Sequence, residues 1–252
     1  MRSSEAAPEK LVPGATCTDG DATAFVVWAP RHENLAIHIL SPREQVLPMQ
    51  TERDGYFRAT VEVSEGARYL VRLPDGRELP DPASRYQPEG VHGPSEVVTC
   101  EFAWSDEEWR GIDLREYVIY ELHVGTHTPE GTFDAVISHL DELRDLCVSA
   151  IELMPVAQFP GDRNWGYDGV SLYAVQESYG GPDGLRRLVD AAHERGIAVV
   201  LDVVYNHLGP EGNYLAELAR TSLTDTRPPG VRRSTLTART AITSADSSSR
   251  ML

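Results

Sequence analysis

A group of polar side chains at the end of a predicted buried strand offers the first candidates for chemistry. An apolar run over residues 197–201 leads directly into Asp202, and Asn206 and His207 follow shortly after it. A carboxylate, an amide and an imidazole are side chains that α/β enzymes place in their active sites. Because ligands bind at the carboxyl ends of parallel strands, we expect these three residues to lie at a ligand site.

A Gly-rich segment over residues 159–169 offers a second set of candidates. It contains Trp165 and Tyr167 among Asn and Asp side chains. Aromatic rings stack on the C–H face of a sugar, and amides and carboxylates bind its hydroxyl groups, so this mixture indicates a saccharide site. The alternative interpretation is that the two rings only pack on the rim of the fold.

The elements that position these residues alternate between strands and helices. Apolar strands without a polar face are typical of parallel strands that are covered on both sides. Their order fits either a doubly wound sheet or a (β/α)8 barrel. A complete barrel takes about 250 residues, whereas residues 117–219 hold about three βα units, so any barrel is incomplete. The predicted strands are 117–123, 150–154 and 197–204, and the predicted helices begin near Thr132 and Pro182.

The N-terminal part has a different pattern, in which apolar and polar side chains alternate with a period of two residues. Between residues 57 and 63, apolar and polar side chains alternate, which predicts a strand with one buried face. Asp54-Gly55 is a turn signal that separates such strands. About five short strands of this kind over residues 14–101 predict a β-sandwich.

Charge and composition narrow the classes of partner. The formal charge of −16 argues against nucleic acid and anionic membranes as partners. No segment has the roughly 18 apolar residues of a membrane span, and no signal peptide is recognised, so we expect a cytoplasmic protein.

Neither the cysteines nor the pair His123 and His127 has the spacing of a metal site, and we expect no metal and no cofactor. The three cysteines are Cys17, Cys100 and Cys147.

Three motifs in chain order carry a family resemblance. They are Met154-Pro155, residues 164–168 and residues 202–207. Together they resemble the successive strand-end motifs of the α-amylase superfamily of glycoside hydrolases. This resemblance implies a catalytic (β/α)8 barrel and an α-1,4-glucan oligosaccharide as the substrate class.

Finer motifs resemble the trehalohydrolases of this superfamily. The resemblance covers roughly residues 13–216, and further matching motifs lie at 81–88, 91–95, 121–126 and 206–214. It implies hydrolysis of the α-1,4-glucosidic bond next to the terminal trehalose unit of maltooligosyl trehalose, with release of trehalose. The alternatives are a 1,4-α-glucan branching enzyme and a non-catalytic glucan-binding fragment.

The resemblance assigns sugar-binding roles to five residues. Tyr167 would stack on the sugar ring next to the bond that is cut, and His207 would hydrogen-bond the primary hydroxyl region of that sugar. Asp202 would be a buried anchor, and Asn206 would organise the strand end. Trp165 would lie at the rim of the site.

The resemblance assigns no catalytic residue to this sequence. The family mechanism uses a nucleophile and an acid about 5–5.5 Å apart, on strands four and five of the barrel. The sequence has no match to those strands, so we expect the chain to be inactive. We predict five segments: a flexible N-terminus (1–13), a β-sandwich accessory domain (14–101), a linker (102–116), a partial catalytic barrel (117–219) and a disordered, out-of-frame tail (220–252).

Overall fold

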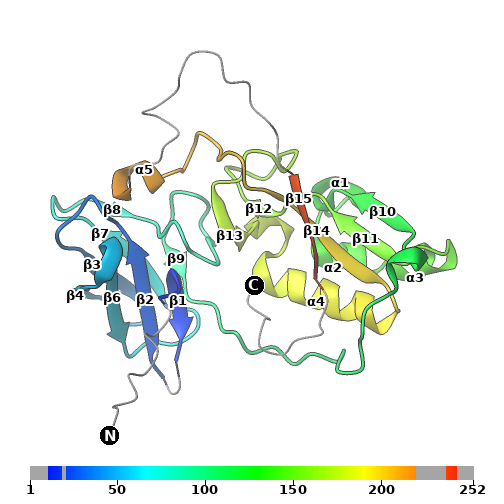
Figure 1. The fold of residues 1–252 in the computed structure, drawn as a ribbon, viewed down its shortest axis with the longest axis horizontal. Coiled ribbons are helices and arrows are strands. Elements are labelled where there is room, and N and C mark those ends of the chain that lie inside the picture. Colours follow the sequence, from blue (N-terminus) through cyan, green and yellow to red (C-terminus); the bar gives the residue numbers. More distant parts are fainter. Residues whose placement is uncertain (1–10, 19–20, 220–236, 243–252) are drawn as a thin grey trace, which may run out of the picture.

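The computed structural model describes residues 11–18 and 21–219, and the backbone of residues 237–242. Antiparallel sheets from the N-terminal part lie beside a parallel sheet with helices from the following part (Figure 1). Most of the predicted flexible segment 1–13 lies outside the described residues. Within the part of the chain that is described, every helix is too short or too polar to traverse a lipid bilayer.

The first antiparallel sheet follows the predicted alternation of polarity. On the strand that begins at Tyr56, Phe57 and Val61 are buried, whereas Thr60 is exposed. Asp54 and Gly55 both adopt positive φ, so the predicted turn is confirmed. The strand order is β1-β2-β6-β5, with β1 (Gly14–Cys17), β2 (Thr23–Trp28), β5 (Gln50–Thr51) and β6 (Tyr56–Val61), and η1 (Arg53–Gly55) precedes β6.

A second antiparallel sheet shares its hydrophobic core with the first. Phe25 of the first sheet contacts Tyr69 of the second, with ring centroids 4.8 Å apart. Both rings are almost completely buried, and burial of such large apolar surfaces is the main stabilising term of a core of this kind. The strands are β3 (Ala36–Ser41), β4 (Gln45–Pro48), β7 (Arg68–Arg72), β8 (Glu78–Leu79) and β9 (Ser95–Glu96), in the order β4-β3-β7-β8, with β9 also paired to β7.

The three predicted apolar strands form a parallel sheet. Strand β10 (Ile119–Leu122) pairs with β11 (Ala150–Leu153), which pairs with β14 (Ala198–Val204). All four residues of β11 are buried, which confirms that this strand is covered on both faces. The segment after β11 contains a hairpin, in which β12 (Ala157–Gln158) and β13 (Ser171–Val175) pair antiparallel.

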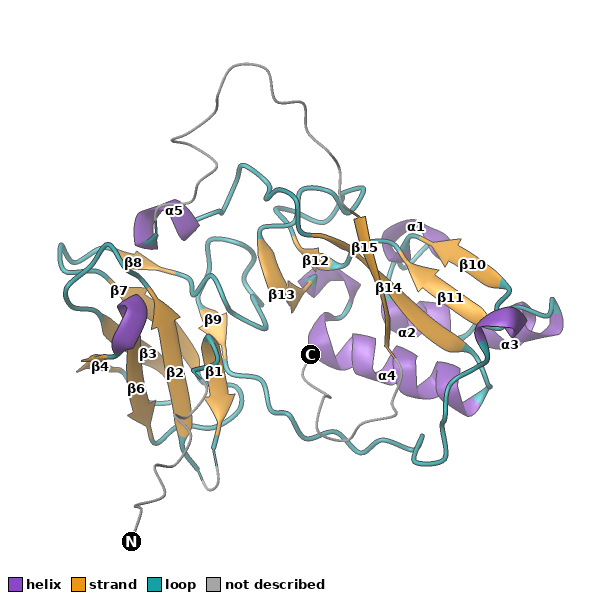
Figure 2. Cartoon of the chain, in the orientation of Figure 1, coloured by secondary structure: helices purple, strands orange, loops and turns teal. Residues whose placement is uncertain are grey.

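Helices cover the parallel sheet, and α4 runs along it beside α2 (Figure 2). Pro182 opens α4 (Gly181–Glu194), as predicted, and Gly196 follows its end with a φ of 72°. The side chain of Thr132 caps α2, but the predicted helix is broken after Ile137 into two. The remaining helices are α1 (Val124–His127), α2 (Phe133–Ile137), α3 (Leu140–Asp145), α5 (Leu215–Leu218), η2 (Leu114–Glu116) and η3 (Glu177–Tyr179).

A short segment of the predicted tail has the backbone of a strand. Strand β15 (Thr237–Ile242) pairs antiparallel with β14, from Val199 opposite Ile242 to Val204 opposite Thr237. The exposed edge of β14 offers backbone donors and acceptors, and these pair with another backbone whatever its composition. Of the segment that we predicted to be disordered, the structure describes only residues 237–242, and the rest of the tail lies outside the described residues.

Helix α5 joins the two parts of the chain. It follows β14 in sequence, yet Leu218 is fully buried in the core of the N-terminal sheets (Figure 1). The guanidinium of Arg31 donates to the carbonyl oxygen of Ala216 at 2.7 Å, and the His32 ring contacts the carbonyl oxygen of Glu217 at 2.8 Å. The loop between β14 and α5 is consequently held at both ends, by the parallel sheet and by the N-terminal sheets.

Candidate functional site

The carboxyl ends of the three parallel strands lie at one edge of their sheet. Ile119 is in register with Ala150, and Ala150 is in register with Ala198. The loops that leave β10, β11 and β14 therefore start side by side. This is the edge at which ligands bind in α/β proteins.

His207 connects the two loops that carry most of the predicted site residues. Its Nε2 lies 2.8 Å from the carbonyl oxygen of Tyr167, and the amide nitrogen of Asn206 lies 2.7 Å from its Nδ1. A carbonyl can only accept a hydrogen bond, so this network assigns the proton to Nε2 and leaves Nδ1 to accept from the amide. The structure thus brings Tyr167, Asn206 and His207 together.

This geometry changes the expected role of His207. Both of its ring nitrogens have protein partners, so a direct hydrogen bond to a sugar would require exchange of one of them. The structure shows His207 in contact with the backbone of Tyr167. The expected hydrogen bond to the primary hydroxyl region of a sugar would have to replace one of the two protein partners. In the structure, the imidazole positions that residue.

The two aromatic rings predicted to bind sugar are accessible. Trp165 is 79% exposed and Tyr167 is 46% exposed. Neither belongs to the hydrophobic cluster of the α/β part, so core packing does not explain these residues. Their exposed faces are available for stacking on a sugar ring.

Asn164 shapes the turn that presents these rings. Its Oδ1 accepts from the backbone nitrogen of Gly166 at 2.7 Å and from that of Asp168 at 3.3 Å. Gly166 has a φ of 96°, and a Cβ there would lie 2.9 Å from the carbonyl oxygen of Pro155. A side chain at position 166 would therefore be strained and crowded.

His123 connects the end of β10 to the same turn. Its Nε2 lies 2.6 Å from the carbonyl oxygen of Asn164 and 3.4 Å from the hydroxyl of Tyr179. Tyr179 belongs to the core, and burial raises its pKa to about 12. Because the Asn164 carbonyl can only accept, Nε2 of His123 carries the proton, and the hydroxyl oxygen of Tyr179 faces it as a second acceptor. His127 has separate neighbours, His139 and Tyr120, and burial lowers its pKa.

Asp202 is buried, as the predicted anchor would be. It is only 6% exposed, and its Oδ1 has no hydrogen-bond partner among the described residues. It lines a cavity of about 400 Å³ together with Gly166 and Tyr205. Buried polar atoms without a partner are rare and mark positions of interest. Among the described residues, no cluster of three His, Cys, Asp or Glu side chains is placed to hold a metal ion.

Two buried glutamines support the base of the aromatic loop, and our sequence reasoning missed them. Gln176 accepts from the backbone nitrogen of Phe159 at 2.9 Å and donates to the carbonyl oxygen of Gly161 at 2.9 Å. Gln158 accepts from the backbone nitrogen of Glu177 at 3.0 Å. The available signal was an amide side chain directly before the Gly-rich segment and another directly after β13, since buried polar side chains need partners of this kind.

The backbones of the two site loops touch at Gly209. Its nitrogen donates to the carbonyl oxygen of Gly169 at 3.0 Å. A Cβ at position 209 would lie 2.2 Å from the carbonyl oxygen of Asp168, which is far inside contact distance. Only a glycine permits this approach of the loop after β14 to the loop after β11.

We expect Gly209→Ala to separate the two site loops and to lower the free energy of unfolding by about 1–3 kcal/mol, as for other overpacked sites. Hydrogen exchange should accelerate at the amides of residues 205–212, and the melting temperature should fall. The control is Gly161→Ala in the loop after β11, where a Cβ meets open space but the φ of 74° disfavours it. Unchanged exchange in Gly209→Ala would contradict the packing argument.

Comparison with known proteins gives a consistent set of matches. The sequence model described as "Alpha amylase, catalytic domain" matches residues 96–228. A malto-oligosyltrehalose trehalohydrolase of Saccharolobus solfataricus is 54% identical over 201 residues, which cover 79% of this chain and 36% of that protein. The enzyme of the same name from Deinococcus radiodurans is 47% identical over 214 residues, covering 84% of this chain and 35% of that protein.

More distant relatives and solved structures agree at the level of the fold. A 1,4-alpha-glucan branching enzyme of Xanthomonas oryzae is 30% identical over 229 residues, covering 82% of this chain and 31% of that protein. The crystal structure of a putative alpha amylase from Salmonella typhimurium has a TM-score of 0.78 and 46% identity, covering 82% of this chain and 35% of that chain. The chain spans about a third of the length of the curated relatives that it matches.

Proposed function

Because the chain belongs to the alpha-amylase family of glycoside hydrolases, we propose that it is the substrate-binding part of an enzyme that hydrolyses the α-1,4-glucosidic bond next to the terminal trehalose unit of maltooligosyl trehalose. Free trehalose is the product. A relative named malto-oligosyltrehalose trehalohydrolase is 56% identical over 203 residues, whereas the branching enzyme is 30% identical. This difference favours hydrolysis over glycan transfer.

The fold proposal follows from the same family membership. The chain has the alpha-amylase family fold with part of the catalytic domain. We propose that residues 14–101 are a β-sandwich accessory domain, which the shared core of the two antiparallel sheets supports. Residues 102–116 are the connection, and residues 117–219 are the first three βα units of a (β/α)8 barrel, which the parallel order β10-β11-β14 supports. A cytoplasmic location is part of this proposal.

The single observation that carries the proposed function is the Tyr167 ring at the shared strand-end edge. The ring is half-exposed, and His207 and Asn206 fix the backbone beneath it. We propose that Tyr167 stacks on the sugar next to the scissile bond, that Trp165 extends this platform at the rim, and that Asp202 anchors the end of β14. These are binding and positioning groups, and we assign no nucleophile or general acid within the described residues.

Substitution of the aromatic platform tests the binding role. We expect Tyr167→Ala to weaken the binding of maltotriosyl trehalose about tenfold, because the ring face is lost, and Tyr167→Phe to retain most of the affinity. Isothermal titration calorimetry with the 252-residue chain measures this. Tyr120→Ala is the matched control, since Tyr120 is 40% exposed and lies on β10. Equal affinities for Tyr167→Ala and wild type would refute the assignment.

The substrate class is tested by ligand comparison and product analysis. We expect maltotriosyl trehalose to bind more tightly than maltopentaose, and cellopentaose to bind least. Trehalose release by the purified chain should not exceed a buffer blank, because the described site provides no pair of carboxylates for retaining hydrolysis. Tighter binding of maltopentaose than of maltotriosyl trehalose would favour the branching-enzyme alternative.

A further inference from the structure

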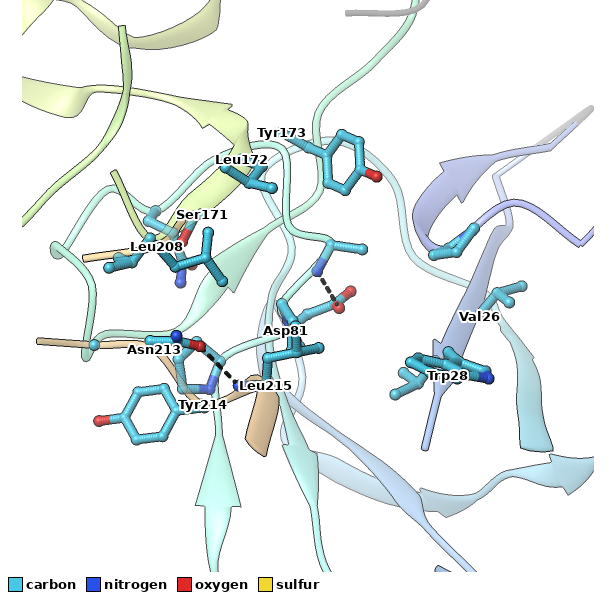
Figure 3. A pocket seen from close by; sticks show the side chains of 18 of the residues that line it. Val26, Trp28, Asp81, Ser171, Leu172, Tyr173, Leu208, Asn213, Tyr214 and Leu215 are labelled. Carbon is cyan, nitrogen blue, oxygen red and sulfur yellow. Dashed lines mark hydrogen bonds between the residues drawn. The ribbon is translucent and has the colours of Figure 1, made fainter. Parts of the chain in front are cut away.

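A second cavity lies between the N-terminal sheets and the α/β part (Figure 3). Its volume is about 260 Å³, which is close to the smallest of the small-ligand pockets, at roughly 300 Å³. One wall comes from β2 and residues 80–83, and the other from β13 and residues 208–215. None of the five predicted site residues lines it.

Four aromatic side chains line this interdomain pocket, and two of them are well exposed. Trp28 is 40% exposed and Tyr173 is 62% exposed, while Tyr56 and Tyr214 complete the set. The indole nitrogen of Trp28 donates to the carbonyl oxygen of Asp54 at 3.1 Å, which fixes the orientation of its ring. Fixed, accessible rings are stacking platforms that lose little entropy when a ligand binds.

The charges around the pocket indicate a neutral ligand. No Lys, Arg or His is among the described residues that line it, and the single charged one is Asp81. Both carboxylate oxygens of Asp81 are in use, because Oδ2 accepts from the Tyr69 hydroxyl at 2.9 Å and Oδ1 accepts from the Ala83 backbone nitrogen at 2.9 Å. A phosphate or carboxylate ligand would find no cationic partner.

Neutral hydrogen-bonding groups complete the lining. Gln87 is fully buried, its Oε1 accepts from the Ser84 hydroxyl at 3.4 Å, and its Nε2 has no partner among the described residues. The Oδ1 of Asn213 accepts from the backbone nitrogen of Leu215 at 3.1 Å (Figure 3). Its amide group carries two donors as well. Aromatic rings combined with side-chain amides suit the hydroxyl-rich, uncharged surface of a sugar.

We propose that this interdomain pocket is a second saccharide site, which takes the terminal units of a neutral α-1,4-glucan chain. The choice of an α-glucan rests on the proposed function, whereas the preference for an uncharged sugar rests on the pocket itself. The site is distinct from the Tyr167 platform, with Trp28 and Tyr173 as its stacking groups.

The position of the pocket connects it to the first site. It shares Pro13, Leu172 and Tyr173 with the 400 Å³ cavity that Asp202 lines. Its wall over residues 208–215 directly follows His207 in the chain. A glucan bound there contacts both parts of the protein and holds the loop whose other end positions Tyr167.

Calorimetric titration of the 252-residue chain with maltotetraose tests the proposal. We expect two binding events in wild type, and Trp28→Ala should weaken one of them about tenfold and leave the other unchanged. Tyr173→Ala, at a more exposed position, should weaken the same event. Tyr120→Ala is the control because Tyr120 has the same exposed fraction as Trp28 and lies away from both cavities. Thermal melts verify that each variant is folded.

The outcomes separate this proposal from the proposed function. If Trp28→Ala and Tyr173→Ala are folded and both leave the titration unchanged, the second site is refuted. If they weaken binding whereas Tyr167→Ala does not, the pocket stands and the role of Tyr167 fails. Glucose 6-phosphate serves as the charged probe, and tighter binding of it than of glucose in a Trp28-dependent manner would overturn the assignment of a neutral sugar.

Discussion

Tyr179→Ala is expected to lower the free energy of unfolding by about 3–5 kcal/mol, as for other large aromatic side chains that are truncated in a core. Tyr179 is 2% exposed and its ring contacts Phe133 and Phe159. Its hydroxyl also reaches His123, which holds the turn of the aromatic loop. The variant should therefore lose both stability and sugar binding, which urea unfolding and calorimetry measure.

Tyr179→Phe separates the ring from its hydroxyl. It retains the packing, so the loss should be about 0.5–1.5 kcal/mol, the contribution of one hydrogen bond. A loss as large as that of Tyr179→Ala would show that the hydroxyl, and not the ring, provides the stability.

Wild type and Tyr179→Phe together also test how the stability of the chain depends on pH in the alkaline range. Burial raises the pKa of Tyr179 to about 12, compared with about 10 in an unfolded chain. Below pH 10 the phenol is neutral in both the folded and the unfolded chain, and its contribution to the free energy of unfolding is fully present. Between pH 10 and pH 12 the unfolded chain ionises first, so stability falls as pH rises, by roughly 2–3 kcal/mol for this group. Tyr179→Phe should lose less stability over that window than wild type.

Asp106→Ala is expected to destabilise the chain by about 3 kcal/mol, because it leaves a buried imidazole without its carboxylate partner. Asp106 lies in the segment that we predicted to be a linker, and its Oδ2 is 2.7 Å from Nδ1 of His193 on α4. Both side chains are only 1% exposed. Trp109 stacks on the same imidazole, with ring centroids 4.4 Å apart. Thermal melts and urea unfolding measure the effect.

Ser105→Ala provides the matched control for this contact. Ser105 is exposed, and its hydroxyl bonds Asp190 and Glu194 on the same helix at 3.0 Å. Because exposed polar contacts contribute little, the loss should be below about 1 kcal/mol. Equal, small effects in both variants would mean that residues 102–116 are a passive connection, as a linker would be.

Much of the fold could be predicted because its signals are local. The alternation of polarity around Phe57 and the apolar run of β14 that leads to Asp202 each report on the burial of a single strand. Pro182 and Gly196 mark the two ends of α4 through their own backbone preferences. The break between α2 and α3, the β12–β13 hairpin and the β15 pairing depend on neighbours distant in sequence, and we did not predict them.

For the candidate site too, some features could be predicted from the sequence and others depend on the tertiary structure. The sequence by itself determined which side chains lie at the strand ends, because parallel strands end at one edge and the motif residues follow those ends directly. Only the tertiary structure decided that His207 bonds the backbone of Tyr167, that Gly209 touches Asp168, and that α5 returns to the N-terminal sheets. These contacts join loops that are tens of residues apart, and residue type and spacing do not specify which distant backbone a side chain or glycine will meet.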